Sequence, residues 1–401
     1  MTPRERVLRA LNHKEPDRVP IDLGSTIVTG IMAIPYRQLK LRWGLGGEVK
    51  LVDWKQQLAL VEEPVLQRIG VDVRPTLPEA RKWDMIEAWK PGELSDGTPC
   101  LVPDWFSPEK LPDGSKVLRD ETGRIVSRMP PGGFYFDDVY HPLQDAETTE
   151  DIEKYNWEYE LPKELLRRIS ERIDELERSG YAIVEAGFFG SVYEAAQNLR
   201  GWDRFMIDLA VNRKFAEYLM DKLVEVHIER FRQYIEAVGD RVDVIVVGDD
   251  LGMETGPQIS PELYRELIKP RQAKLYRYIK DRCSAKLFLH SCGSVYKLIP
   301  DFIEIGVDIL NPVQVAAQDM DSARLKREFG RDLVFWGGGC DTQHVLPFAT
   351  PEEVREEVKR RIEDFAPGGG YVFNQVHNIQ VGVPPENIEA MFEAALEFGV
   401  Y

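Results

Sequence analysis

The sequence predicts an α/β protein folded as a (β/α)8 TIM barrel, and two observations lead to this prediction. From residue 180 onward, short β-rich runs alternate with helical stretches, which is the order that produces a parallel sheet. The runs are apolar almost throughout, as expected for strands that are covered on both faces. Eight such strands with outer helices close into a barrel.

The strands can be assigned in chain order. The first two are residues 18–24 (RVPIDLG) and 70–76 (GVDVRPT). The other six are 181–187 (YAIVEAG), 242–250 (VDVIVVGDD), 285–293 (AKLFLHSCG), 306–313 (GVDILNPV), 332–339 (DLVFWGGG) and 370–377 (GYVFNQVH). Helices are predicted at 213–238, 261–282 and 351–365, the last two beginning at Ser-Pro or Thr-Pro. The main alternative is an open doubly wound sheet. It usually carries a G-x-G-x-x-G loop after its first strand, and this chain has none there.

A segment of different composition, about residues 80–160, separates the second strand from the third. It is rich in Trp, Pro, Gly and Asp, and "SKVLRDETGRIVSRMPPGG" predicts a β-hairpin that turns at residues 121–123. We interpret it as an insertion near one mouth of a single barrel domain, residues 1–401. Its aromatic side chains either form a small core of their own or line a cleft: Trp105, Phe106, Phe134, Tyr135 and Phe136.

Charge and composition exclude several classes of partner. The chain has 51 basic and 68 acidic residues, so its net charge is −17, which opposes non-specific binding to nucleic acid or anionic lipid. The N-terminus lacks the apolar core of a signal peptide, and no apolar run reaches transmembrane length. We therefore expect a soluble, cytoplasmic protein without nucleic-acid or membrane partners. Four cysteines in 401 residues do not make a disulfide framework.

Polar residues gather where the strands end, which is where barrel enzymes place their chemistry. They are Glu185, Asp249, Asp250, His290, Cys292, Asn311, Cys340 and His377. His290 and Cys292 are two positions apart, so in an extended chain they project to the same side. Imidazole and thiolate both bind zinc, and three protein ligands with one open position are typical of catalytic zinc. Cys340 and His377 end nearby strands, so either could complete such a site. Of the two aspartates we favour Asp250 for a functional role, because buried carboxylates at a barrel mouth often hold a cation or a proton.

Longer stretches of the chain resemble the uroporphyrinogen decarboxylase superfamily over nearly its whole length. They are "TPRERVLRALNHKEPDRVPIDLG", "GDDLGMETGPQISPELYRELIKP", "LFLHSCGSVYKLIPDFIEIGVDILNPVQ" and "PGGGYVFNQVHNIQVGVPPENIEAMFEAA". Decarboxylases of this superfamily carry an arginine-rich segment, roughly R-Q-A-G-R-Y, that binds the carboxylates of a tetrapyrrole. Here residues 18–37 hold only Arg18 and Arg37, at the edges. The chain is therefore more similar to the cobalamin-dependent methyltransferase branch, whose H-x-C motif and later cysteine bind zinc.

The resemblance implies a ligand set and a reaction. His290 and Cys292 match the H-x-C motif. In the best-known members the later cysteine falls in the final strand region, where this chain has His377. We predict His290, Cys292 and Cys340 as metal ligands, with His377 either a fourth ligand or, with Asp250, a catalytic residue. Asn311 and Glu185 are predicted to contact the cofactor.

Zinc would ionise a small-molecule thiol, which takes a methyl group from the cobalt of a corrinoid, or the transfer would run in the opposite direction. The chain has no D-x-H-x-x-G signature of a cobalamin-binding domain, so a partner protein would supply the corrinoid. Two alternatives stay open: decarboxylation of a porphyrinogen or related acid, and non-catalytic binding of a metal or corrinoid.

Overall fold

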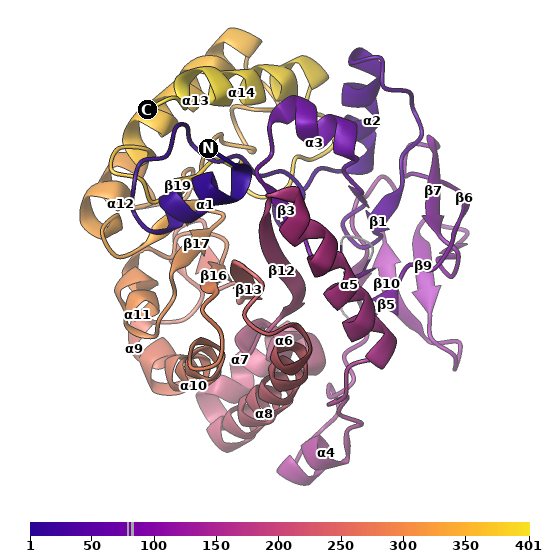
Figure 1. The fold of residues 1–401 in the computed structure, drawn as a ribbon. Helices are drawn as coiled ribbons and strands as arrows, with labels where there is room; N and C mark the ends of the chain where they lie inside the picture. Colours follow the sequence, from indigo (N-terminus) through magenta and orange to yellow (C-terminus); the bar gives the residue numbers. More distant parts are fainter. Residues whose placement is uncertain (78–79, 82–83) are drawn as a thin grey trace.

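The computed structural model describes residues 1–77, 80–81 and 84–401 (Figure 1). Its centre is a curled parallel sheet of seven strands in the order β19-β18-β17-β16-β13-β12-β3. The strands are β3 (Val73–Pro75), β12 (Ala182–Phe189), β13 (Val244–Gly248), β16 (Lys286–His290), β17 (Ile309–Asn311), β18 (Val334–Trp336) and β19 (Tyr371–Val372). Each neighbouring pair is parallel, and the (β/α)8 prediction is confirmed.

The predicted first strand closes the barrel, although it is reduced to a single bridge. Ile21 pairs in parallel with Phe373, beside β19. On its other side the carbonyl oxygen of Ile21 accepts a hydrogen bond of 2.9 Å from the backbone N–H of Asp72, beside β3. Residues 20–22 therefore join the two outer strands of the seven-stranded sheet.

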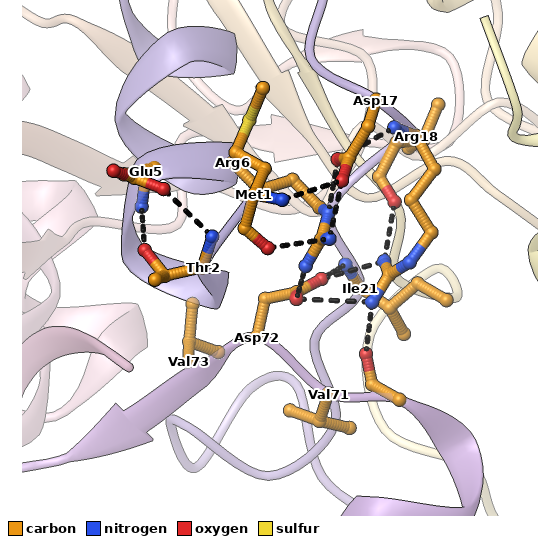
Figure 2. A network of polar contacts seen from close by, with 12 residues as sticks. Met1, Thr2, Glu5, Arg6, Asp17, Arg18, Ile21, Val71, Asp72 and Val73 are labelled. Carbon is orange, nitrogen blue, oxygen red and sulfur yellow. Dashed lines mark hydrogen bonds and ion pairs between the residues drawn. The ribbon is translucent and has the colours of Figure 1, made fainter. Parts of the chain in front are cut away.

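A buried ion-pair network fastens this seam (Figure 2). Asp72 is 1% exposed, and its carboxylate accepts hydrogen bonds from Arg6 (2.6 Å), Arg18 (2.8 Å) and the backbone N–H of Ile21 (2.9 Å). Arg6 lies on α1 (Pro3–Leu11) and also binds Asp17. The network ties the N-terminal helix and the first strand to the start of β3.

Helices surround the sheet (Figure 1). The larger ones are α2 (Ala33–Arg42), α5 (Lys163–Ser179), α7 (Trp202–Val211), α8 (Arg213–Val238), α10 (Lys269–Lys280), α13 (Pro351–Phe365) and α14 (Pro385–Phe398). Shorter helices are α3 (Glu63–Ile69), α4 (Thr149–Lys154), α6 (Tyr193–Arg200), α11 (Ile299–Glu304) and α12 (Ser322–Phe329).

The predicted helices at 213–238 and 351–365 are confirmed as α8 and α13. The N-terminus of α13 is fixed by a capping box of Thr350 and Glu353. The helix predicted at 261–282 is instead three pieces: α9 (Pro261–Leu263), a π-helical turn at Tyr264–Ile268, and α10. None of the helices in the described part of the chain combines the length and the apolar composition that a membrane crossing requires.

The insertion forms small antiparallel sheets at one side of the barrel, beside α2 and α5 in Figure 1. Its strands are β4 (Ala80–Arg81), β5 (Asp84–Met85), β6 (Trp89–Glu93), β7 (Pro99–Pro103), β8 (Glu109–Lys110), β9 (Lys116–Arg119), β10 (Ile125–Met129) and β11 (Asp137–Asp138). Residues 82–83 of the predicted insertion lie outside the described residues. The predicted hairpin is confirmed: β9 and β10 are antiparallel and turn at Gly123, whose φ is 83°.

Four of the five aromatic residues named in the insertion have contacts that locate them. Trp105, Phe106 and Phe136 pack around Trp54, which lies between β1 (Leu51–Asp53) and β2 (Leu58–Ala59), with ring centroids 5.8–6.4 Å from its own. These rings form the small core of the insertion. Tyr135 instead receives a hydrogen bond of 2.9 Å from Gln380, in the loop that follows His377. The insertion therefore reaches the carboxyl ends of the barrel strands.

Candidate metal centre

Three side chains from two strand ends meet at the carboxyl side of the barrel. His290 is the last residue of β16, Cys292 follows it by two positions, and His377 lies in the loop after β19. One ligand atom from each side chain lies within 4.8 Å of the other two. In the part of the chain that the structure describes, this is the group of histidine, cysteine and carboxylate side chains that could hold a metal ion.

The tertiary structure fixes which nitrogen of His290 faces the cluster. Its Nδ1 and the side-chain Oδ1 of Asn311 share a hydrogen bond of 2.6 Å. Asn311 is fully buried and is held in turn, because its amide group donates to the carbonyl oxygen of Trp336 at 2.8 Å. This arrangement places the proton of His290 on Nδ1, so that Nε2, 3.4 Å from Cys292 Sγ, is the ligand atom.

His377 reaches the cluster through an unusual backbone conformation. Its φ is 58°, in the left-handed region that non-glycine residues rarely adopt. Gln375 stabilises this turn by donating to the carbonyl oxygen of His377 at 2.8 Å. The ring of His377 lies 5.4 Å from that of His290, centroid to centroid.

One distance between ligand atoms matches a tetrahedral zinc site. Cys292 Sγ and His290 Nε2 are 3.4 Å apart. Two atoms that bind one zinc ion at the usual Zn–S and Zn–N lengths stand roughly 3.5 Å apart in tetrahedral geometry. Two imidazoles and one thiolate are zinc ligands, and three protein ligands leave a fourth position for a substrate.

The electrostatics of the cluster also suit a cation. Burial and the nearby Asp250 carboxylate raise the pKa of the Cys292 thiol well above its usual value. Burial, together with the neighbouring His290, lowers the pKa of His377 to about 4, so this imidazole is neutral at pH 7. Asp250 Oδ1 lies 3.7 Å from His290 Nε2 and accepts the backbone N–H of Cys292 at 2.8 Å. A bound cation would stabilise the thiolate in a site that otherwise keeps the thiol protonated.

The structure does not bring Cys340 to this cluster. Its Sγ is fully buried, 3.9 Å from the carbonyl oxygen of Asp341. Burial raises the pKa of this thiol, and so does the charge of Glu357 on α13. Cys340 thus faces the helical layer outside the sheet, and the group of residues that could hold a metal contains His377 in place of the predicted Cys340. The direction of a side chain after a run of three glycines does not follow from strand periodicity.

The other predicted site residues fall into two groups. Asp250 lies at the cluster, and Asn311 orients His290 instead of facing an open mouth. Glu185 is buried elsewhere: it accepts hydrogen bonds from Thr76 (2.9 Å) and from the backbone of Gly187 (2.5 Å). A further partner, Tyr234, lies on α8, so Glu185 faces the helical layer and not the cluster. The structure therefore does not place Glu185 where a cofactor at the cluster would meet it.

Three residues near Cys292 were not predicted as site residues from the sequence. Glu194, on the first turn of α6, accepts the backbone N–H of Asp250, and burial raises its pKa to about 8. Tyr135 and Glu254 approach from the insertion and from the loop after β13, and both interact electrostatically with Cys292. No local pattern marks them, because they lie on a helix and on two loops that are distant from Cys292 in the sequence.

A family model described as uroporphyrinogen decarboxylase (URO-D) matches residues 138–398, more than half of the sequence. The chain belongs to the uroporphyrinogen decarboxylase family. The matched region contains β12 through α14 and thus all three residues of the cluster.

Individual relatives agree with this membership. The curated uroporphyrinogen decarboxylase of Psychromonas ingrahamii is 29% identical over 183 residues, which is 45% of this chain and 48% of that protein. The one from Methylococcus capsulatus is 26% identical over 227 residues, which is 53% of this chain and 59% of that protein. The matches therefore span about half the length of these relatives.

A solved structure has the same fold over the whole chain. It is a methyltransferase from Methanosarcina mazei, with a TM-score of 0.61 and 18% identity, and the alignment covers 99% of both chains. This likeness shows that the two chains share their fold.

Proposed function

We propose that this chain is a zinc-dependent methyltransferase that moves a methyl group between a corrinoid partner protein and a small-molecule thiol. The observation that supports this most is the cluster of His290, Cys292 and His377, with His290 oriented by Asn311. A zinc ion held by these three residues supplies a Lewis acid that keeps a bound thiol ionised near neutral pH. The Methanosarcina methyltransferase, whose fold this chain shares, is consistent with the same chemistry.

The chain's own residues have distinct parts in this proposal. His290, Cys292 and His377 hold the metal, and Asn311 keeps the Nε2 atom of His290 toward it. Asp250 lies beside both His290 and Cys292, so it is placed to accept the proton that a substrate thiol loses. Tyr135 brings the insertion near the site, because it accepts a hydrogen bond from Gln380 and interacts electrostatically with Cys292.

Decarboxylation of a porphyrinogen is a second candidate, favoured by the names of the curated relatives. It needs cationic side chains for several substrate carboxylates. Of the two arginines at the edges of residues 18–37, Arg18 is occupied, because it binds Asp72 and the carbonyl oxygen of Gly70 at the barrel seam. We therefore favour methyl transfer.

One experiment separates the two candidates. Purified, zinc-loaded protein is incubated either with methylcobalamin and a thiol or with uroporphyrinogen. We expect methylcobalamin to lose its methyl group, which is measured by the change in its visible absorption. The methyl thioether of the thiol should form at the same time. No coproporphyrinogen should form. The proposal is contradicted if protein produced in zinc-supplemented medium contains no zinc. It is also contradicted if coproporphyrinogen forms at an enzymatic rate.

A further inference from the structure

A hairpin that follows β13 folds over the loop that carries Cys292. It consists of β14 (Gly252–Met253) and β15 (Gly256–Pro257). The backbones meet without room for a side chain: a Cβ atom on Gly252 would lie 2.4 Å from the carbonyl oxygen of Cys292. Ser294 also donates its backbone N–H to Met253 at 2.8 Å. The tip of the hairpin is thereby fixed next to the metal cluster.

The tip carries Glu254, whose carboxylate is held from two other loops. Gln314 and Gln343 each donate to its Oε1, at 2.8 and 3.0 Å. Gln314 at the same time accepts the backbone N–H of Gly293, the residue after Cys292, at 2.8 Å. The side-chain amide of Gln314 thus bridges the Glu254 carboxylate and the Cys292–Gly293 peptide and holds the carboxylate in place. Both donors use Oε1, and Oε2 remains accessible because Glu254 is exposed.

The surroundings of Cys292 are negatively charged. Asp250 accepts the backbone N–H of Cys292 at 2.8 Å, and Glu254 is linked to the backbone N–H of Gly293 through Gln314. The ammonium group of Lys55, a cation that acts on this region, is paired with Asp138. Asp250 is close enough to the cluster to balance the charge of a bound metal. Glu254 stands further out, beyond Gln314, which separates its carboxylate from the Cys292–Gly293 peptide.

We propose that the small-molecule substrate of this site carries a cationic group, such as an ammonium, and that Glu254 binds it. This inference rests on the proposed function, because the substrate's thiol is taken to occupy the metal centre. A sulfonate or carboxylate in the same place would meet a fixed carboxylate and be repelled. An ammonium there would form a charge-assisted hydrogen bond with a group that needs no reorganisation.

Three thiols of the same length test the proposal, since they differ only in the end group: 2-aminoethanethiol is cationic, 2-mercaptoethanol neutral and 2-mercaptoethanesulfonate anionic. Their dissociation constants are measured by calorimetry on the full, zinc-loaded chain and on its Glu254→Gln variant. Glu363→Gln, an exposed change on α13 with the same loss of charge, is the control. For each protein we take the ratio of the dissociation constants of two thiols. Comparing this ratio between proteins cancels the intrinsic difference in thiol acidity.

We expect the wild-type chain and Glu363→Gln to favour the ammonium over the sulfonate. In Glu254→Gln this ratio should fall by about fivefold, the size expected for a partly exposed ion pair. An unchanged ratio in Glu254→Gln, or tighter binding of the sulfonate by the wild-type chain, would overturn the inference while leaving the proposed function in place. Failure of all three thiols to bind would remove both the thiol chemistry and this inference.

Discussion

Nδ1 of His290 and Oδ1 of Asn311 are 2.6 Å apart, and this contact joins the ends of two neighbouring strands, β16 and β17. The asparagine amide is anchored on the opposite side by the carbonyl oxygen of Trp336 in β18. Three consecutive strands of the sheet thus determine the orientation of one imidazole. An imidazole with a fixed tautomer binds a metal without first paying the entropy of ordering its ring.

The first prediction concerns Asn311. Asn311→Leu should lower zinc affinity by about 10–100-fold, because the Nδ1–H of His290 loses its acceptor and the ring its orientation. Asn311→Asp keeps an acceptor at the same place and should retain most of the affinity. Competitive titration with a chromophoric chelator measures both variants. Equal affinities for the two variants would contradict this role.

The second prediction concerns the ligand set. His377→Ala and Cys292→Ala should each lose at least about tenfold in zinc affinity, because each removes a direct ligand. Cys340→Ala removes a thiol that faces α13 and should keep about one zinc ion per chain. Metal analysis after dialysis measures the zinc content of the three variants. Zinc lost from Cys340→Ala but retained by His377→Ala would restore Cys340 as the third ligand.

The close approach at Gly293 gives a third prediction. Gly293 and Gly123 both have φ of 83°, so alanine is equally strained at both. A Cβ on Gly293 would lie 2.5 Å from the backbone of Gly252, whereas nothing lies within 4 Å of one on Gly123. Gly123→Ala should cost about 1–2 kcal/mol of unfolding free energy from the left-handed backbone alone. Gly293→Ala should cost more and also weaken zinc binding, because Cys292 must move. Urea unfolding and zinc titration of both variants test this.

The barrel seam provides a fourth prediction. Asp72→Asn removes the charge that balances Arg6 and Arg18, and we expect a loss of about 3–5 kcal/mol of unfolding free energy. Asp17→Asn is the control within the same network: its side chain is 42% exposed, and the change should stay within about 1 kcal/mol. Chemical unfolding of the metal-free chains measures both. Similar losses for the two variants would show that burial does not decide the strength of this network.

The fifth prediction concerns acid stability. His227 is buried on α8, shares a hydrogen bond of 2.7 Å with the carbonyl oxygen of Ser191, and has its pKa lowered from 6.5 to about 4, chiefly by burial. Between pH 6.5 and 4 the unfolded chain binds a proton that the folded chain refuses, so stability falls as the pH falls. By pH 4.5 this residue should account for about 2–3 kcal/mol of lost stability.

The variant His227→Gln cannot take up that proton, so its stability should fall less between pH 7 and 4.5. His141→Gln is the matched control, since it also removes a histidine bonded to a backbone carbonyl, but one outside the core. Urea midpoints are measured with a chelator present, so that the metal site does not contribute. An acid sensitivity in His227→Gln equal to that of the wild-type chain would disprove the assignment.

The sequence by itself determined the barrel and two of the three residues of the candidate metal cluster. Apolar runs alternating with helices specify parallel strands, and the runs at 181–187, 242–250, 285–293, 306–313, 332–339 and 370–377 all contain strands of the sheet. The separation of two residues between His290 and Cys292 sufficed to predict that they lie together. Such patterns can be interpreted from the sequence because side chains within a strand alternate in direction with a fixed period.

The tertiary structure alone decided the rest. His377 and Cys340 both follow strand ends, and the choice between them depends on backbone angles beyond the strand, among them the φ of 58° at His377. Asn311 acquires its partners from the neighbouring strands β16 and β18, and Glu254 acquires its position from loops that follow other strands. In loops, the direction of a side chain does not follow a fixed sequence period. Contacts with distant parts of the chain therefore determine which side chains reach the site and which turn toward the helices.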